Sequence, residues 1–312
     1  MANLKESELK ELEIEERCLR LSNPHLLPDE DDVLYHFGLT KHSTDLPVVF
    51  GDVRFVCTGG SVGRLACVAQ EIATSLGITD GSDRRNLCNS DRYCMYKVGP
   101  ALCVNHGMGV PSLSIMLIEV IKLLHHARCK NVTFFRIGTS GGLGLEPGTV
   151  VVSNAAVNCE LKPIHVQYVL GQRTERPATL DQKLVQELLE IGSTLPFPVA
   201  TGATMCADDF YEGQGRLDGA FCEYSMEDKF KYIQTLFDAG VRNIEMESVC
   251  FASMMTRADV RGAIVCATIV NRFDGDQVAI DKATIKQFET RPMDLVIAYI
   301  KRHWKKPEVS AS

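Results

Sequence analysis

The strongest constraint on the fold is a short apolar run that ends in a cluster of glycines. Residues 132–137 read V-T-F-F-R-I, and G-T-S-G-G follows directly at 138–142. The run predicts a buried β-strand. The glycines predict a turn whose backbone N–H groups point into one concavity, which is a typical anion-binding arrangement. The sequence therefore favours a fold in which strands end in ligand-binding turns.

Arg136 lies inside this apolar run, two residues before the expected turn. A guanidinium group in an apolar environment is costly unless an anion pairs with it. With the hydroxyls of Thr139 and Ser140, Arg136 predicts a site for an oxyanion. The alternative is a tight turn in which Arg136 pairs with a structural carboxylate.

A second junction of the same kind lies earlier in the chain. Residues 53–57 read as a strand, T-G-G-S-V-G-R follows at 58–64, and a helix is predicted over 65–76, ended by Gly77. The glycine spacing fits neither the dinucleotide fingerprint nor a Walker loop. Two strand–glycine junctions that each carry an arginine favour the anion site over the structural turn.

Strands and helices alternate along the rest of the chain. Further strands are predicted at 94–98, 101–105, 148–154, 199–207, 243–247 and 262–270, and further helices at 112–127, 180–191, 227–239, 248–258 and 285–301. This alternation predicts an α/β protein with a largely parallel or mixed sheet. Ligand sites in such folds lie at the carboxyl ends of the strands. We expect a charged leader at 1–32, a catalytic domain at 33–304 and a disordered tail at 305–312.

Composition excludes several classes of protein. The net charge is −7 and the pI about 5.7, so the chain lacks the basic surface of a nucleic-acid-binding protein. The N-terminus lacks the apolar core of a signal peptide, and the apolar helix near 111–127 is too short to span a bilayer. The 12 cysteines form no C-x-x-C pair, so reduced thiols in a cytoplasmic protein are expected rather than disulfides or a zinc site.

A loop at 208–219, D-D-F-Y-E-G-Q-G-R-L-D-G, is dense in hydrogen-bond donors. Phe210, Gln214 and Arg216 could together bind a planar heterocycle that carries carbonyl groups. The alternative is a structural loop that satisfies its own polar groups. Further along, Glu245 and Glu247 occupy alternate positions of a predicted strand and so should share one face.

Six motifs resemble those of the uridine phosphorylases, the pyrimidine branch of the nucleoside phosphorylase-I family. The motifs are G-G-S-V-G-R at 59–64, D-R-Y at 91–93, H-G-M-G-V-P-S at 106–112, R-I-G-T-S-G-G at 136–142, F-Y-E-G-Q-G-R at 210–216 and N-I-E-M-E-S at 243–248. The likeness covers about 33–303 and is closest to the animal enzymes. It implies a single-domain fold with a mixed, partly barrel-like central sheet flanked by helices.

The resemblance also implies a role for each matching residue. Phosphate is expected at Gly60, Arg64, Arg136 and Thr139; uracil at Phe210, Gln214, Arg216, Ile269 and Val270; ribose at Met246 and Glu247; and, from a second subunit, Arg92 at phosphate and His36 at ribose. Arg136, Gln214, Arg216 and Glu247 are the expected catalytic residues. Valine stands at position 62, where proline is common in the family. Cys88 and Cys94 flank Arg92, and either a redox pair or two ordinary thiols fits that spacing.

The implied reaction is reversible phosphorolysis of uridine to uracil and ribose 1-phosphate, a pentosyl transfer in pyrimidine salvage and catabolism. Phosphate is a co-substrate, and no cofactor or metal ion is expected; the partners are small molecules and a second copy of the chain. Relatives that act on purines carry an aspartate where this chain reads I-V-N-R at 269–272. The alternatives are a nucleosidase or purine-type member of the same fold, or an inactive nucleoside-binding relative.

Overall fold

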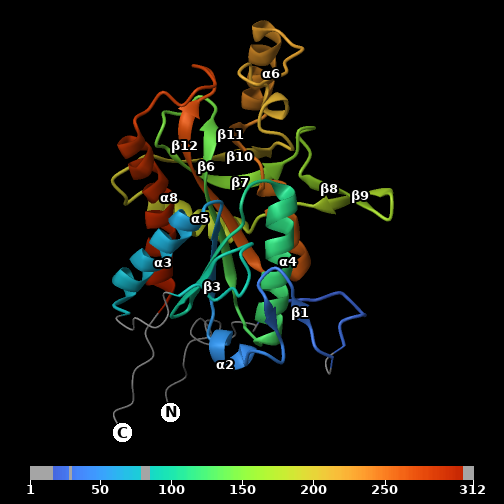
Figure 1. Cartoon of the computed structure of the whole chain (residues 1–312). Coiled ribbons are helices and arrows are strands. Elements are labelled where there is room, and N and C mark those ends of the chain that lie inside the picture. The colour runs from blue at the N-terminus through green and yellow to red at the C-terminus, as the bar shows by residue number, and fades with distance from the viewer. Residues whose placement is uncertain (1–16, 28–29, 79–84, 305–312) are drawn as a thin grey trace, which may run out of the picture.

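The computed structural model describes residues 17–27, 30–78 and 85–304, and its centre is a mixed eight-stranded sheet (Figure 1). In spatial order the strands are β11 (Val241–Glu245), β10 (Val199–Cys206), β7 (Val150–Val157), β12 (Arg261–Asn271), β6 (Thr133–Gly142), β3 (Phe55–Gly59), β5 (Ala101–Asn105) and β4 (Met95–Val98). The strand pair at 94–98 and 101–105 is thus confirmed as an antiparallel pair.

The sheet closes on itself at one end. β11 pairs with β10 and also with β6, with Ile244 opposite Gly141. The strands β6, β12, β7, β10 and β11 therefore form a closed ring, while β3, β5 and β4 extend it as an open sheet. Parallel pairs such as β6–β12 occur beside antiparallel ones such as β7–β12. The predicted α/β fold with a mixed, partly barrel-like sheet is confirmed.

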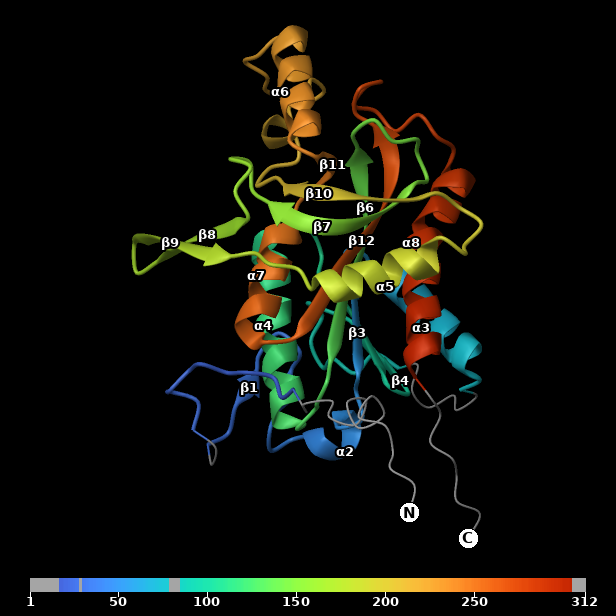
Figure 2. The ribbon, with the colours of Figure 1, turned by 180° about the vertical axis from the view of Figure 1, so that it is seen from behind.

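Helices cover both faces of this sheet (Figures 1 and 2). One hydrophobic cluster packs α3 (Val62–Leu76), α5 (Gln182–Gly192) and α8 (Lys282–His303) against the sheet, and another packs α2 (Leu46–Phe50), α4 (Val110–His126) and α7 (Ser248–Ala258). Because both faces are covered, the first six residues of β6 are all buried. This explains why the apolar run at 132–137 has no polar alternation.

Two elements project from the body in Figure 1: helix α6 (Met226–Asp238), and the hairpin of β8 (Ile164–Val169) and β9 (Gln172–Pro177). The sequence did not predict this hairpin, because β9 reads Q-R-T-E-R-P, has no apolar alternation and is mostly exposed. A second, smaller hairpin joins β1 (Val33–Leu34) to β2 (Leu39–Thr40). A short 3₁₀ helix, η2 (Glu212–Gln214), lies in the loop at 208–219.

The described part of the predicted leader lies against the domain. The backbone N–H of Arg20 donates to the carbonyl of Ala258 over 2.9 Å, and Leu19 is buried. Residues 1–16 of that leader, and the predicted tail at 305–312, lie outside the described residues.

The predicted turn at 138–142 is wrong, because β6 continues through these glycines to Gly142. None of Gly138, Gly141 and Gly142 has a positive φ; positive-φ glycines lie instead between β5 and α4, at Gly107 and Gly109, and after β6, at Gly144. A Cβ atom at Gly138 would lie 2.5 Å from Nη1 of Arg136, and one at Gly141 would lie 3.0 Å from Cγ of Arg272. These glycines therefore leave room for two buried guanidinium side chains.

The predicted strand at 243–247 is also shorter than expected. β11 ends at Glu245, and Glu247 is the residue directly before α7. The Glu245 side chain accepts from the backbone N–H groups of Glu247, at 3.0 Å, and Ser248, at 2.8 Å. The carboxylate of the strand end thus fixes the start of the helix, as anionic groups at helix N-termini generally do.

Gly59 and Gly63 offer a matched test of close packing between strands. A Cβ at Gly59 would lie 2.8 Å from the carbonyl oxygen of Ile137 on β6, whereas a Cβ at Gly63 in α3 would meet nothing within 4 Å. We expect Gly59→Ala to lower the free energy of unfolding by about 1–3 kcal/mol, as overpacking does. Gly63→Ala should leave it unchanged or raise it by up to about 1 kcal/mol. Urea titrations at one protein concentration measure both, and equal midpoints for the two variants would contradict the close approach of β3 and β6.

Candidate active site

A cavity of about 450 Å³ lies at the carboxyl ends of β3, β5, β6 and β12. This is where parallel strands of α/β proteins present their ligand sites. All the site residues predicted for this chain's own cavity line it, namely Gly60, Arg64, Arg136, Thr139, Phe210, Gln214, Arg216, Met246, Glu247, Ile269 and Val270. The structure therefore brings together side chains from five separate stretches of the sequence.

Arg136 is the buried cation at one end of this cavity. Its side chain is 4% exposed and pairs with both Glu245, at 2.7 Å, and Glu247. Its Nη1 also donates to Sγ of Cys266 over 3.0 Å. Arg136 is thus tied to the end of β11 and to β12, and it occupies a fixed position beside Thr139.

The two carboxyl groups that share Arg136 differ in their surroundings. Burial would raise the pKa of Glu247, but Arg136, His106 and the backbone N–H of Gly109 lower it to about 2. Burial raises the pKa of Glu245 above its ordinary value, although Arg136 opposes this. Glu247 is therefore ionised at neutral pH, and its Oε1 accepts from the backbone N–H of Gly109 over 2.5 Å.

His106 follows β5 and lines the same end of the cavity, although the sequence analysis gave it no role. It is 1% exposed, and neither ring nitrogen has a hydrogen-bond partner among the described residues. Burial and the charge of Arg136 lower the pKa of His106 to about 4, so its ring is neutral at pH 7. A neutral imidazole offers one donor and one acceptor to a ligand.

Arg64 projects from the first turn of α3 into the cavity. Its Nη2 lies 2.6 Å from Oε1 of Glu289 on α8, and its side chain is 15% exposed. The Nε atoms of Arg64 and Arg136 are both buried without a partner among the described residues. Both arginines line the same end of the cavity, and two guanidinium groups placed together there indicate a place for an anion.

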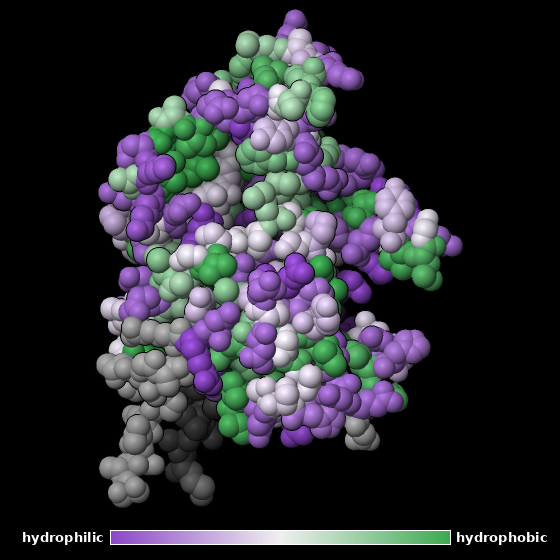
Figure 3. All heavy atoms as spheres, in the orientation of Figure 1, coloured by the Kyte–Doolittle hydropathy of each residue, from purple (hydrophilic) through white to green (hydrophobic). Residues whose placement is uncertain are grey.

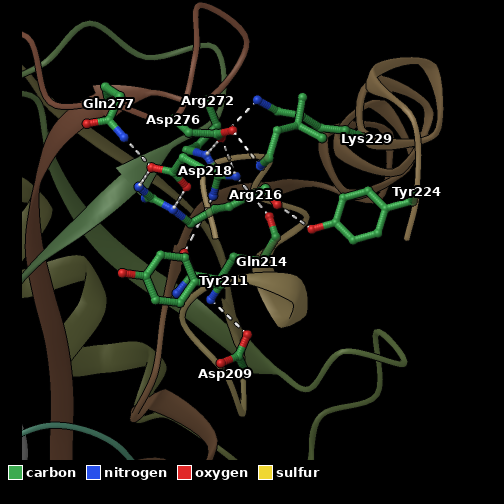
Figure 4. Close-up of polar contacts among 11 residues, drawn as sticks. Asp209, Tyr211, Gln214, Arg216, Asp218, Tyr224, Lys229, Arg272, Asp276 and Gln277 are labelled. Carbon is green, nitrogen blue, oxygen red and sulfur yellow. Dashed lines mark hydrogen bonds and ion pairs between the residues drawn. The ribbon is translucent and has the colours of Figure 1, made fainter. Parts of the chain in front are cut away.

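The other end of the cavity is built by the loop at 208–219 (Figure 4). Arg216 is held by Asp218 through two parallel contacts of 2.8 and 2.6 Å, and its guanidinium lies 4.4 Å from the centre of the Phe210 ring. Gln214 is 5% exposed, and its backbone carbonyl accepts from Nη2 of Arg272 over 2.9 Å. Phe210, Gln214 and Arg216 all line this end of the cavity, and their role in binding a heterocycle stays a prediction.

Arg272 also lies at this end of the cavity, although the sequence alone placed it only at the end of a predicted strand. It is 1% exposed and lines the cavity next to Gln214. The sequence offered one signal for its role, which is a charged residue close behind the apolar run of β12. Its partners could not be read from the sequence, because Gln214 precedes it by 58 residues.

His36 and Arg92, the residues expected to serve a second subunit, do not line this cavity. The His36 ring lies 2.6 Å from Oε1 of Glu119, and the Arg92 side chain is 71% exposed, with Asp91 3.8 Å away. The hydroxyl of Ser90 donates to the His36 carbonyl and accepts from the Arg92 backbone N–H. The two residues therefore form one surface unit. The thiols of Cys88 and Cys94 nearby are free.

Exposed apolar side chains occur on the same side of the molecule. Tyr35 is 74% exposed and Ile118, on α4, is 51% exposed. Figure 3 shows hydrophobic residues at several separate places among hydrophilic ones on the face that carries α4 and the β1–β2 hairpin. Among the described residues, no helix is long and apolar enough to cross a membrane, and no group of three or more His, Cys, Asp or Glu side chains is arranged to hold a metal ion.

Comparison with known proteins agrees with this geometry. The family model of the phosphorylase superfamily matches residues 54–301. A protein of Caenorhabditis elegans named uridine and thymidine phosphorylase is 54% identical over 88% of this chain and 92% of its own. Uridine phosphorylase 1 of Mus musculus is 50% identical over 91% of this chain and 92% of its own.

A solved structure agrees as well. The crystal structure of uridine phosphorylase from Schistosoma mansoni in complex with thymidine superposes with a TM-score of 0.87 at 43% identity, covering 91% of this chain and 98% of that one. These matches cover most of the chain, and the closed sheet with a cavity at its strand ends agrees with them. The chain therefore belongs to the phosphorylase superfamily and, within it, to the uridine phosphorylases.

Proposed function

We propose that the protein catalyses the reversible phosphorolysis of uridine to uracil and ribose 1-phosphate. The observation that carries the proposal is the polarity of this cavity. Two arginines with unpartnered Nε atoms lie at one end, an ionised Glu247 lies beside them, and Gln214 with Arg216 lies at the other end. This order matches phosphate, sugar and base.

Phosphate is the nucleophile in this reaction. The glycosidic C–N bond breaks and a C–O bond to phosphate forms, while the P–O bonds stay intact. Arg64 and Arg136 would bind the anion through charge-assisted hydrogen bonds, which are short and directional. Their task is to hold one phosphate oxygen next to the anomeric carbon, which makes the attack effectively intramolecular.

The sugar develops positive charge as the C–N bond breaks, as in other glycosidic cleavages. Glu247 is ionised because its pKa lies near 2, and Met246 lies next to it in the cavity wall. The carboxylate would accept hydrogen bonds from the ribose hydroxyls and would stabilise the cationic sugar. Glu245, which caps α7, would act by keeping Glu247 in place.

The base departs with negative charge on its carbonyl oxygens. Donors from Gln214 and Arg216 bind this charge more strongly in the transition state than in the substrate, and such differential binding accelerates a reaction. Arg216 is already oriented by Asp218 and stacked on Phe210. Ile269 and Val270 would cover the ring of the base.

We propose further that the protein is a homodimer with shared active sites. At the phosphate end, two guanidinium groups, Arg64 and Arg136, meet three carboxyl groups, Glu245, Glu247 and Glu289. A phosphate dianion there needs additional positive charge. Arg92 of a second copy would supply it, and His36 would accompany it because Ser90 joins the two.

We propose that the protein acts in the salvage and catabolism of pyrimidine nucleosides and that it does so in the cytoplasm. The 12 cysteines are all free thiols, as suits a reducing compartment. Thymidine is a second candidate substrate, because one of the most similar relatives is named for both nucleosides.

The decisive experiment measures uracil release from uridine with and without phosphate. Release that requires phosphate supports the proposal. Release that continues without phosphate identifies a nucleosidase, and no release under either condition identifies an inactive relative. Inosine in the same assay distinguishes a purine-type enzyme, and thymidine tests the second substrate.

Gln214→Leu tests the base end of the cavity. Leucine keeps the volume but removes the donor and acceptor, so the polar edge of uracil is left unpaired in a closed site. We expect kcat/KM for uridine to fall by about 10⁴-fold, with the Kd for phosphate nearly unchanged. Gln70→Leu on α3, outside the cavity, is the matched control. Near-normal kcat/KM in Gln214→Leu would show that this loop does not bind the base.

A mixed dimer tests the shared site. Arg136→Ala and Arg92→Ala should each be nearly inactive, because an anion site loses a charge-assisted partner. In a mixed dimer one site carries both defects and the other carries neither. Since random mixing makes about half of the dimers mixed, co-expression should restore roughly a quarter of wild-type activity. Mixed dimers that form but stay inactive would place both arginines in one chain's site.

A further inference from the structure

Asp276 is a buried carboxylate outside the cavity that joins three elements of the base end (Figure 4). Its Oδ1 accepts from Nζ of Lys229 on α6 at 2.8 Å and from Nη2 of Arg272 at 2.9 Å. Its Oδ2 accepts from the backbone N–H of Leu217 at 2.9 Å. Asp276 is 8% exposed and Lys229 is 4% exposed, so these contacts are shielded from competing water.

These contacts reach Gln214 and Arg216 from both sides. Arg272, oriented by Asp276, donates from Nη2 to the backbone carbonyl of Gln214 over 2.9 Å. Its Nη1 lies 3.5 Å from the side-chain amide oxygen of the same residue. Leu217, held directly by Asp276, follows Arg216 in the chain. One carboxylate therefore fixes the backbone before and after the guanidinium that faces the base.

The charges of this network distinguish positioning from simple electrostatics. The linked side chains carry three cations, Arg216, Lys229 and Arg272, and two anions, Asp218 and Asp276. If Asp276 acted only through its charge, its removal would raise the positive charge near the departing base and help the reaction. If it acts by holding the donors in place, its removal should slow the reaction.

We propose that Asp276 is a positioning residue that keeps Gln214 and Arg216 directed at the departing base, with Lys229 anchoring α6 to the same point. The inference rests on the proposed function, because it concerns the stabilisation of the base as it leaves. Directed donors matter most where negative charge develops. They matter less for a base that stabilises its own negative charge, such as 5-fluorouracil, whose fluorine withdraws electrons.

The test compares uridine with 5-fluorouridine in Asp276→Asn. We expect kcat for uridine to fall about 100-fold, as when one preorganised donor is lost. For 5-fluorouridine the loss should be several times smaller, and KM for phosphate should stay within about twofold of wild type, because Arg64 and Arg136 are untouched. A merely structural defect would lower both rates equally.

Lys229→Met provides a second variant, because it removes one contact and leaves Arg272 paired with Asp276. It should show the same preference for 5-fluorouridine with a smaller loss for uridine. Glu187→Gln is the control, since it breaks an ion pair with Arg261 at the opposite end of β12. That variant should keep the wild-type ratio of the two rates.

The outcomes separate this inference from the proposed function. No phosphorolysis of uridine by the wild-type protein would refute the proposed function itself. An active wild type, with equal losses on both nucleosides in folded Asp276→Asn or Lys229→Met, would overturn the positioning role and leave the proposed function standing. A rise in kcat for Asp276→Asn would also overturn it, in favour of a purely electrostatic role.

Discussion

The buried ion cluster of Arg136 with Glu245 and Glu247 is the interaction on which the rest of the site depends. A guanidinium this deeply buried must be paired, because an uncompensated buried charge costs several kcal/mol, typically about 3–5. The pairing of β11 with β6 that closes the sheet also brings both carboxylates to Arg136. Closure of the sheet and assembly of the site are therefore one structural event, and the small residues after Arg136 make it possible.

The two ends of the cavity have opposite imbalances of charge. At the phosphate end the carboxyl groups outnumber the guanidinium groups, whereas at the base end the linked cations outnumber the anions by one. A reaction that moves negative charge from phosphate toward the base suits this gradient. The proposed second subunit would add Arg92 at the phosphate end, where the carboxyl groups are in excess.

The sequence predicted the alternation of strands and helices, and it identified the residues that line the cavity, because local apolar runs and short motifs encode both. It failed where the outcome depends on distant partners. The glycines at 138–142 read as a turn, yet β6 continues through them and pairs with β12 as far as Gly142. Glycine stands at 138 and 141 because Arg136 and Arg272 occupy the space that a Cβ atom would fill. Asp276 had no local signal, since Lys229 lies 47 residues away. The β8–β9 hairpin was missed because β9 carries no hydrophobic pattern, although β8 alternates apolar and polar residues as I-H-V-Q-Y-V.

The surface unit of His36, Ser90 and Arg92 gives the proposed dimer a geometric consequence. The hydroxyl of Ser90 bonds to the backbone of both His36 and Arg92 and so links the two segments, whereas the Arg92 side chain itself is 71% exposed. Glu119 on α4 fixes the same unit, through the His36 ring at 2.6 Å and through backbone N–H groups of His36 and Phe37. In the proposed dimer, a neighbouring subunit would therefore supply its phosphate and ribose contacts from linked segments. In the proposed dimer, a shift of the neighbouring subunit would thus alter the phosphate and ribose contacts together, whereas the base end is built from residues of the chain's own cavity.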